Sequence, residues 1–167
     1  MSEDSVCGPG SLFHNTEAVR AALIDWTGRY GIKTLVDAGA GDIFWIRSLF
    51  PEFTNQGLAY QAFDREALVP EVNQLDYTRE LLPECDAILC RHSLNHNDFD
   101  GVIRALELFR RSTTILMATQ FSEPQPAKAK APGFTRFNLA IAPFNLGEPL
   151  ELVKDAKDTS LALWRLT

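Results

Sequence analysis

The feature of this sequence that most constrains its fold is residues 34–42, an apolar segment followed by a turn with two glycines. Residues 34–38 are predicted to form a strand and residues 43–50 a helix. Gly39 and Gly41 let the backbone take positive φ angles and let a ligand approach the main chain closely. A strand, a glycine turn and a helix in this order form a corner that cradles a nucleotide, so an α/β fold is expected.

The residues around the glycines indicate which kind of nucleotide to expect. The dinucleotide-binding fingerprint requires a small residue three positions after its second glycine, where this chain has Phe44. Its bulk disfavours a pyrophosphate and therefore a nicotinamide-dependent dehydrogenase. Asp37, before the turn, instead favours a ligand with a positive end, such as the ammonium and sulfonium of S-adenosylmethionine (SAM). The alternative is an ordinary strand-to-helix turn of an α/β protein.

Strands and helices are predicted to alternate along the rest of the chain. Thr16 and Asp98 are typical N-caps, and apolar residues at helical spacing follow each of them, over residues 16–30 and 99–111. Further strands are predicted at residues 58–63, 72–75, 87–90, 113–119, 150–153 and 161–165. The last two strands favour an antiparallel hairpin. We therefore expect a Rossmann-like open, mostly parallel sheet with a C-terminal antiparallel hairpin.

Length and composition favour a single globular domain over residues 1–167. Apolar residues make up 46% of the chain, and the net charge of −6 disfavours binding to nucleic-acid phosphates. No signal peptide or membrane-spanning stretch is visible, and the three cysteines include no Cys-x-x-Cys pair. We expect a cytoplasmic protein that binds neither nucleic acid nor membrane.

Two segments lack apolar periodicity. Residues 1–10 are polar and rich in Gly and Pro, which is typical of an arm that is flexible or draped over a ligand. Residues 120–133 are rich in Pro, Ala and Lys, and a loop of this length is expected to be a lid or mobile.

Acidic residues recur at the ends of the predicted strands. Asp37, Asp64 and Asp76 each follow or end a strand, and ligands of open α/β sheets lie at the carboxyl ends of the strands, where the strand order reverses. A ligand with an ammonium group, a ribose diol and an adenine amine would relieve the repulsion among these carboxylates. Asp64 suits the two ribose hydroxyls and Asp76 the adenine edge. Taken singly, each aspartate is alternatively a cap or turn residue.

The segment after the fourth strand adds titratable groups at the same edge. Arg91 is expected to pair with a ligand carboxylate or with one of the acidic residues. His92 and His96 are candidate general bases, because neutral imidazole titrates near physiological pH. His96 is the favoured base, with Asp98 or Asp100 to hold its ring. The alternative is a histidine that caps a helix or satisfies a loop carbonyl, and metal binding is disfavoured because no third ligand stands at a suitable spacing.

Together these pieces resemble a class I SAM-dependent methyltransferase, and more narrowly a compact bacterial and phage group of such enzymes. The matching segments fall in family order: residues 8–11, 15–16, 35–42, 74–78, 87–96, 137–139, 143–146 and 163–166. The resemblance implies a seven-stranded sheet with its cofactor along the glycine turn. The cofactor residues it implies are Asp37, Gly39, Gly41 and Asp42 for SAM, Asp64 for the ribose and Asp76 for the adenine.

The same resemblance implies how other segments surround the cofactor. Residues 1–14 would form an arm in which Gly10 and Ser11 cover the methionine end. The loop from Arg91 to His96 would border the pocket of the methyl acceptor, and residues 137–145 would form another wall. The product would be S-adenosylhomocysteine.

The chain also departs from the pattern of this group. Gly39-Ala40 stands where Pro-Cys is common, a change that keeps the turn. Only eleven residues separate Asp64 from Asp76, where a full helix and a longer loop are usual. One face of the sheet there is expected to be bare, covered by a partner, or closed by residues 68–70. His92 stands where an acidic residue is common.

The function expected from the sequence is SAM-dependent transfer of a methyl group to an oxygen or nitrogen of a small molecule or an exposed side chain. His96 or His92 would accept the proton of the acceptor. The alternative is a catalytically weak or inactive methyltransferase-like module that binds SAM and acts as a partner subunit. A protein partner or a homodimer is compatible with both.

Overall fold

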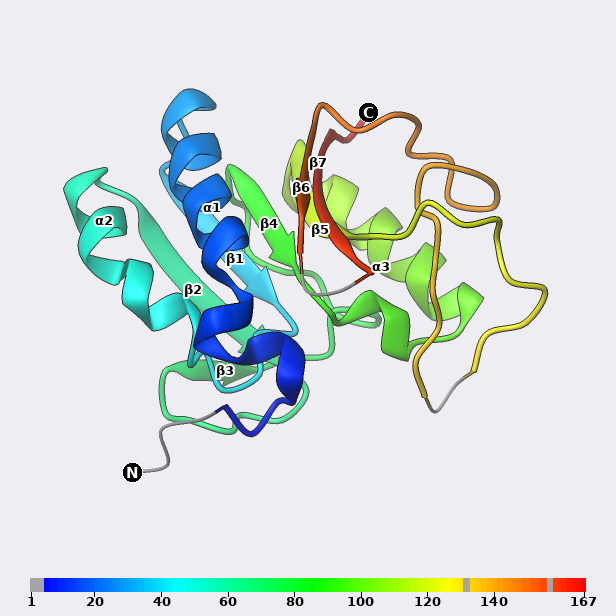
Figure 1. Cartoon of the computed structure of the whole chain (residues 1–167), viewed down its shortest axis with the longest axis horizontal. Coiled ribbons are helices and arrows are strands. Elements are labelled where there is room, and N and C mark those ends of the chain that lie inside the picture. Colours follow the sequence, from blue (N-terminus) through cyan, green and yellow to red (C-terminus); the bar gives the residue numbers. More distant parts are fainter. Residues whose placement is uncertain (1–4, 131–132, 156–157) are drawn as a thin grey trace.

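Seven strands form one sheet in the computed structural model, which describes residues 5–130, 133–155 and 158–167 (Figure 1). They are β1 (Thr34–Ala38), β2 (Ala59–Asp64), β3 (Val72–Gln74), β4 (Ala87–Cys90), β5 (Ile115–Gln120), β6 (Glu151–Lys154) and β7 (Ser160–Arg165). Their order across the sheet is β3-β2-β1-β4-β5-β7-β6. The expectation of a Rossmann-like, seven-stranded, mostly parallel sheet is confirmed.

The strand directions locate the crevice of the sheet. Strands β1 to β5 pair in parallel, whereas β7 runs antiparallel to both β5 and β6, as the predicted hairpin requires. Strands β2 and β3 follow one another on one side of β1, and β4 then lies on the other side of β1. This reversal leaves a crevice at the carboxyl ends of β1 and β4, which is where ligands bind in open α/β sheets.

Helices and a long segment cover the two faces of the sheet (Figure 1). Helix α1 (Glu17–Arg29), a 3₁₀ turn (Ile46–Leu49) and α2 (Phe50–Asn55) pack on one face. Helix α3 (Phe99–Ser112) and part of the segment between β5 and β6 pack on the other face. Each face thus has its own apolar core, and the sheet separates the two.

Helix α3 illustrates how the sequence specifies this packing. The Oδ1 atom of Asp98 accepts the Gly101 N–H at 2.7 Å and caps the helix, as predicted. Its buried stripe follows helical spacing and consists of Val102, Ala105, Leu106 and Phe109. Phe137, Leu139 and Phe144, from the segment after β5, complete the same core.

The helix predicted at residues 43–50 is displaced in the structure. Ile43 has a φ of 50°, and helical backbone begins only with the 3₁₀ turn at Ile46. The α-helix starts at Phe50 with Pro51 in its first turn. Proline has no N–H to donate and its ring clashes with the preceding turn of a helix, so it is tolerated at a helix start and not in its interior. The glycine turn therefore leads into a loop.

The short connection between β2 and β3 contains no helix among its residues 65–71. Val69 packs against the α1 and α2 core, whereas Leu68 is 48% exposed. The sequence left open whether this face is bare, covered by a partner or closed by residues 68–70, and the structure shows that Val69 closes part of it.

Parts of two predicted segments lie outside the described residues, namely residues 1–4 of the arm and 131–132 of the loop after β5. Residues 121–130 contain no helix or strand. Within the described ranges, no helix has the length and apolar character needed to cross a membrane.

Candidate functional site

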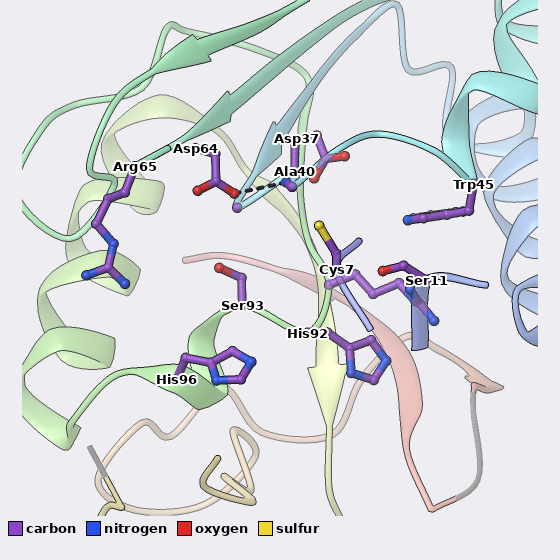
Figure 2. Close-up of a pocket in the computed structure, with 13 residues that line it drawn as sticks. Cys7, Ser11, Asp37, Ala40, Trp45, Asp64, Arg65, His92, Ser93 and His96 are labelled. Carbon is purple, nitrogen blue, oxygen red and sulfur yellow. Dashed lines mark hydrogen bonds between the residues drawn. The ribbon is translucent and has the colours of Figure 1, made fainter. Parts of the chain in front are cut away.

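A cavity of about 280 Å³ lies in the crevice at the carboxyl ends of β1 and β4 (Figure 2). Its lining residues are Cys7, Ser11, Asp37, Gly39, Ala40, Gly41, Trp45, Asp64, Arg65, Arg91, His92, Ser93 and His96. Figure 2 shows two facing sides, which we call the acidic wall (Asp37 and Asp64) and the histidine wall (His92, Ser93 and His96). The topology thus brings together four segments that are distant in the sequence.

The glycine turn after β1 forms the floor of the cavity. Gly39 and Gly41 have φ angles of 79° and 61°, which side chains other than glycine rarely adopt. A Cβ atom on Gly39 would overlap with Ser93, and one on Gly41 would lie 2.6 Å from Sγ of Cys7. Both positions therefore require glycine, because the backbone has a positive φ and because Ser93 and Cys7 lie too close to leave room for a Cβ atom.

Asp37 is buried at the base of the acidic wall. Its Oδ2 accepts the Tyr60 hydroxyl at 2.7 Å. Burial and the nearby Asp64 carboxylate together raise the pKa of Asp37 to about 7, against the opposing effects of the Tyr60 hydrogen bond and of Arg91. Asp37 therefore gives up its proton far less readily than an exposed aspartate.

Asp64 completes the acidic wall at the end of β2. Its Oδ2 accepts the Gly41 N–H at 2.9 Å, and its Oδ1 accepts the Glu66 N–H at 3.2 Å. A carboxylate has about four acceptor positions, so Asp64 retains the capacity to bind hydroxyl groups of a ligand.

An N-terminal arm (residues 5–15) crosses the crevice and is held at two points. Asp42 does not line the cavity, but its Oδ2 accepts the Ser5 hydroxyl and the Val6 N–H, each at 2.8 Å. The Gly10 carbonyl, also outside the lining, accepts Nη2 of Arg91 at 2.7 Å. These contacts place Ser11 and the thiol of Cys7 in the cavity wall.

Arg91 lies in a buried ion pair with a residue that the sequence did not single out. Its Nε and Nη2 donate to the two carboxylate oxygens of Asp155, at 2.8 and 2.6 Å, and its guanidinium lies 4.9 Å from the Trp45 ring centroid. Nε2 of His92 lies 3.0 Å from Oδ2 of Asp155. Burial opposes ionisation of Asp155, but the hydrogen bonds from His92 and Arg91 and their charges outweigh it and lower the pKa to about 2.

The two candidate bases occupy different surroundings. His92 has a φ of 54°, its N–H donates to Oγ1 of Thr119 at 2.7 Å, and its side chain is 22% exposed. His96 is exposed, with Nδ1 3.1 Å from the Gly133 carbonyl and its ring edge-on to Phe134. A backbone carbonyl therefore stands where the sequence suggested the carboxylate of Asp98 or Asp100.

Asp76 lies outside the cavity lining. Its Oδ1 accepts the backbone N–H and the hydroxyl of Thr78, at 3.0 and 2.6 Å. Burial opposes ionisation of Asp76, but these two bonds outweigh it and lower the pKa. The carboxylate therefore stabilises a local turn, and its predicted place beside an adenine stays a prediction.

Most of the predicted site residues meet in the crevice. Those that line the cavity are Asp37, Gly39, Gly41, Asp64, Arg91, Ser11, His92 and His96, whereas Gly10, Asp42 and Asp76 lie outside the lining. Sequence reasoning missed Cys7, Trp45, Arg65, Ser93 and Asp155 as participants. Ser93 could have been found from the sequence, because it lies between Arg91 and His96 in the loop that was singled out. No pattern in the sequence pointed to Asp155.

Several solved structures that share this fold are methyltransferases. The mitomycin 7-O-methyltransferase MmcR matches with a TM-score of 0.66 at 17% identity, over 91% of this chain and 53% of that protein. The magnesium protoporphyrin IX methyltransferase ChlM from Synechocystis PCC 6803, solved with bound SAM, matches with a TM-score of 0.63 at 14% identity, over 89% and 78%. CalO1, a methyltransferase in calicheamicin biosynthesis solved with S-adenosylhomocysteine, matches with a TM-score of 0.61 at 18% identity, over 89% and 54%.

These comparisons establish the fold. The chain has the fold of class I SAM-dependent methyltransferases, so the resemblance inferred from the sequence is confirmed at that level. The chain spans about half the length of MmcR and of CalO1. No protein-family model matches the sequence, and no curated protein matches it significantly.

Proposed function

We propose that this chain is a SAM-dependent methyltransferase that methylates an oxygen or nitrogen of a small molecule or an exposed side chain. The observation that carries the proposal is the crevice between β1 and β4, where the acidic wall and glycine turn face two imidazoles in a methyltransferase fold. This is the place where the fold class binds its ligands. SAM as the cofactor is further supported by ChlM and CalO1, which were solved with SAM or its product.

The chemistry of the crevice residues fits the groups of SAM. Asp37 offers a buried carboxylate to a cation, and Asp64 offers acceptors to a ribose diol. Ser11 supplies a hydroxyl donor for the carboxylate of the methionine end. Nε and Nη2 of Arg91 already donate to Asp155 and to the Gly10 carbonyl, so Arg91 pairs with an acidic residue of the chain. The Cys7 thiol fills the space on Gly41, so the arm must shift for a ligand to lie on the turn.

The residues around the crevice serve alignment and proton transfer. When bound, SAM supplies a methyl group whose bond to sulfur breaks with its electron pair going to sulfur, as a lone pair of the acceptor forms the new bond to carbon. The walls hold the reacting atoms in line, which supplies most of the acceleration that this chemistry needs. His92 or His96 takes the proton that the acceptor loses.

Calorimetry tests this proposal directly. The wild-type chain should bind SAM and S-adenosylhomocysteine, and Gly41→Val should abolish binding because its branched side chain fills the turn. Gly57→Val is the matched control, since Gly57 also has a positive φ but a Cβ there has open space and lies away from the crevice. Transfer of labelled methyl from SAM to a panel of acceptors then tests catalysis. Equal affinity in the wild-type chain and Gly41→Val would place the site elsewhere.

A further inference from the structure

The turn between β6 and β7 contributes a side chain to the base of the histidine wall. Asp155 is fully buried, and its carboxylate accepts Nε and Nη2 of Arg91 and lies 3.0 Å from Nε2 of His92. The contact with His92 joins residues 63 positions apart. Asp155 does not line the cavity, so whatever it does for a ligand there must act through its neighbours.

This contact determines which nitrogen of His92 carries the proton. An ionised carboxylate only accepts hydrogen bonds, and the pairing with Arg91 keeps Asp155 ionised. Nε2 of neutral His92 must therefore bear the hydrogen, which leaves the lone pair on Nδ1. A carboxylate that holds one ring nitrogen in this way selects the tautomer and the orientation of the imidazole.

The backbone and its neighbours also hold His92 in place. Its φ of 54° is uncommon for a residue other than glycine, and its N–H is bound to Thr119. Gly10 of the arm packs against the ring, because a Cβ built there would lie 3.7 Å from Cε1 and Nε2 of His92. His96, by contrast, is exposed and has a backbone carbonyl as its partner, which cannot balance a positive charge on the ring as a carboxylate can.

We infer that Asp155 is a positioning residue for His92 and makes its Nδ1 the proton acceptor of the reaction. This inference rests on the proposed methyl transfer. The proton released by the acceptor goes to Nδ1, and the imidazolium so formed stays bound through Nε2–H to the Asp155 carboxylate. Arg91 keeps that carboxylate ionised, and His92 rather than His96 is the base.

Proton NMR tests the hydrogen bond without any reaction. An imidazole N–H held by a buried carboxylate gives a downfield signal that is protected from exchange, and the chain has only three histidines to assign. His92→Asn identifies the signal, because asparagine tolerates positive φ. The signal should be downfield and protected in the wild-type chain and should lose that downfield shift and protection in Asp155→Asn, because a neutral amide oxygen accepts a weaker hydrogen bond than a carboxylate. Its persistence in Asp155→Asn would overturn the inference.

A second variant guards against misfolding. Asp155→Asn leaves the charge of Arg91 buried without its partner, so the double variant Arg91→Met with Asp155→Asn removes both charges together. It should also lack the signal. The matched control is Asp158→Asn, the same change in the same turn at an exposed pair with Arg136, which should keep it.

Turnover tests the positioning role. Asp155→Asn should lower kcat by about 10²-fold, as misplacement of a catalytic group does, while the affinity for SAM changes little. His92→Asn should lower kcat at least as far. A chain that carries both His92→Asn and Asp155→Asn should be no slower than His92→Asn alone. Additive losses, or an unchanged kcat in Asp155→Asn, would overturn the inference. A wild-type chain that binds no SAM would refute the proposed function, and the NMR signal still decides the contact.

Discussion

Asp37 and Asp155 are the same residue type, both buried within a few side chains of the same crevice, yet their carboxyl groups behave in opposite ways. Asp37 has a hydroxyl as its hydrogen-bond partner and a carboxylate nearby, and its pKa rises to about 7. Asp155 has a guanidinium and an imidazole, and its pKa falls to about 2.

The difference separates two uses of a buried carboxylate. The negative charge of Asp155 is already neutralised inside the protein, so it organises Arg91 and His92. The charge of Asp37 lacks such a cation among its described hydrogen bonds and becomes fully favourable when a cationic ligand arrives. Each wall of the crevice therefore has its own electrostatic task, and the following predictions test that division from the largest effect to the smallest.

Arg91→Ala should cause the largest loss of stability. It leaves the Asp155 carboxylate buried without its bidentate partner, and breaking a buried pair in this way costs about 3–5 kcal/mol. Urea unfolding measures the loss. Arg136→Ala, which removes two exposed pairs, should change the stability by less than about 1 kcal/mol. A small effect of Arg91→Ala would mean that Asp155 does not depend on this pairing.

The stability of the ligand-free chain should fall as the pH rises from about 4 to 7. The folded-state pKa of Asp37 is raised to about 7 from its ordinary value of 3.8, so between these pH values the folded chain holds a proton that the unfolded chain has lost. Above pH 7 this lowers the free energy of unfolding by about 4 kcal/mol. Asp37→Asn should remove this slope and stabilise the chain at pH 8. The same slope in the variant would assign the titration to another group.

Asp155 should produce the opposite slope in acid. Its folded-state pKa is lowered to about 2 from 3.8, so the stability that it contributes is present above about pH 4 and is lost as the pH falls through 2. The loss is about 2 kcal/mol. Unfolding of the wild-type chain between pH 2 and 4 measures it, and a stability that stays flat there would contradict the contrast with Asp37.

Asp64→Ala should weaken SAM binding by about tenfold, which corresponds to about 1.4 kcal/mol and to the loss of one charge-assisted hydrogen bond. Part of the effect will come through the turn, because Asp64 also holds the Gly41 N–H. Calorimetry measures the affinity. Glu66→Ala changes an exposed neighbour and should leave it unaltered. Unchanged binding in Asp64→Ala would place the ribose elsewhere.

The smallest effect is expected at Asp42. Asp42→Ala removes the bonds to Ser5 and Val6, each worth about 0.5–1.5 kcal/mol, and should speed hydrogen exchange at the Val6 amide by up to about tenfold. Amides of β4 serve as the internal reference. Unchanged exchange at Val6 would show that the contact with Arg91 alone holds the arm.

The sequence predicted the acidic wall better than the histidine wall, for a physical reason. A strand, an acid and two glycines are neighbours in the chain, so their pattern is local, and the sheet order then brings Asp64 beside them. The misplaced helix after the turn shows the limit of such patterns, because apolar spacing at residues 43–50 outweighed the signal of Pro51.

The histidine wall depends on a contact that no local pattern carries. Arg91 and Asp155 are 64 positions apart, and an aspartate in a turn between two strands is too common to stand out. The partner of His96 likewise comes from Gly133, in a segment without helix or strand periodicity. Asp76 shows the converse, because its local turn role was the alternative weighed for every strand-end aspartate.

The hairpin of β6 and β7 has a consequence for how such a protein can diversify. Because β7 runs antiparallel to its neighbours, the turn that carries Asp155 emerges at the same edge of the sheet as the glycine turn, without a crossover helix. Hairpin turns change in length and composition at little cost to the strands that they join. Substitutions there can change the surroundings of His92 while leaving Asp37 and Asp64 untouched. Under the proposed function, the acceptor side and the cofactor side of the crevice could then be altered independently.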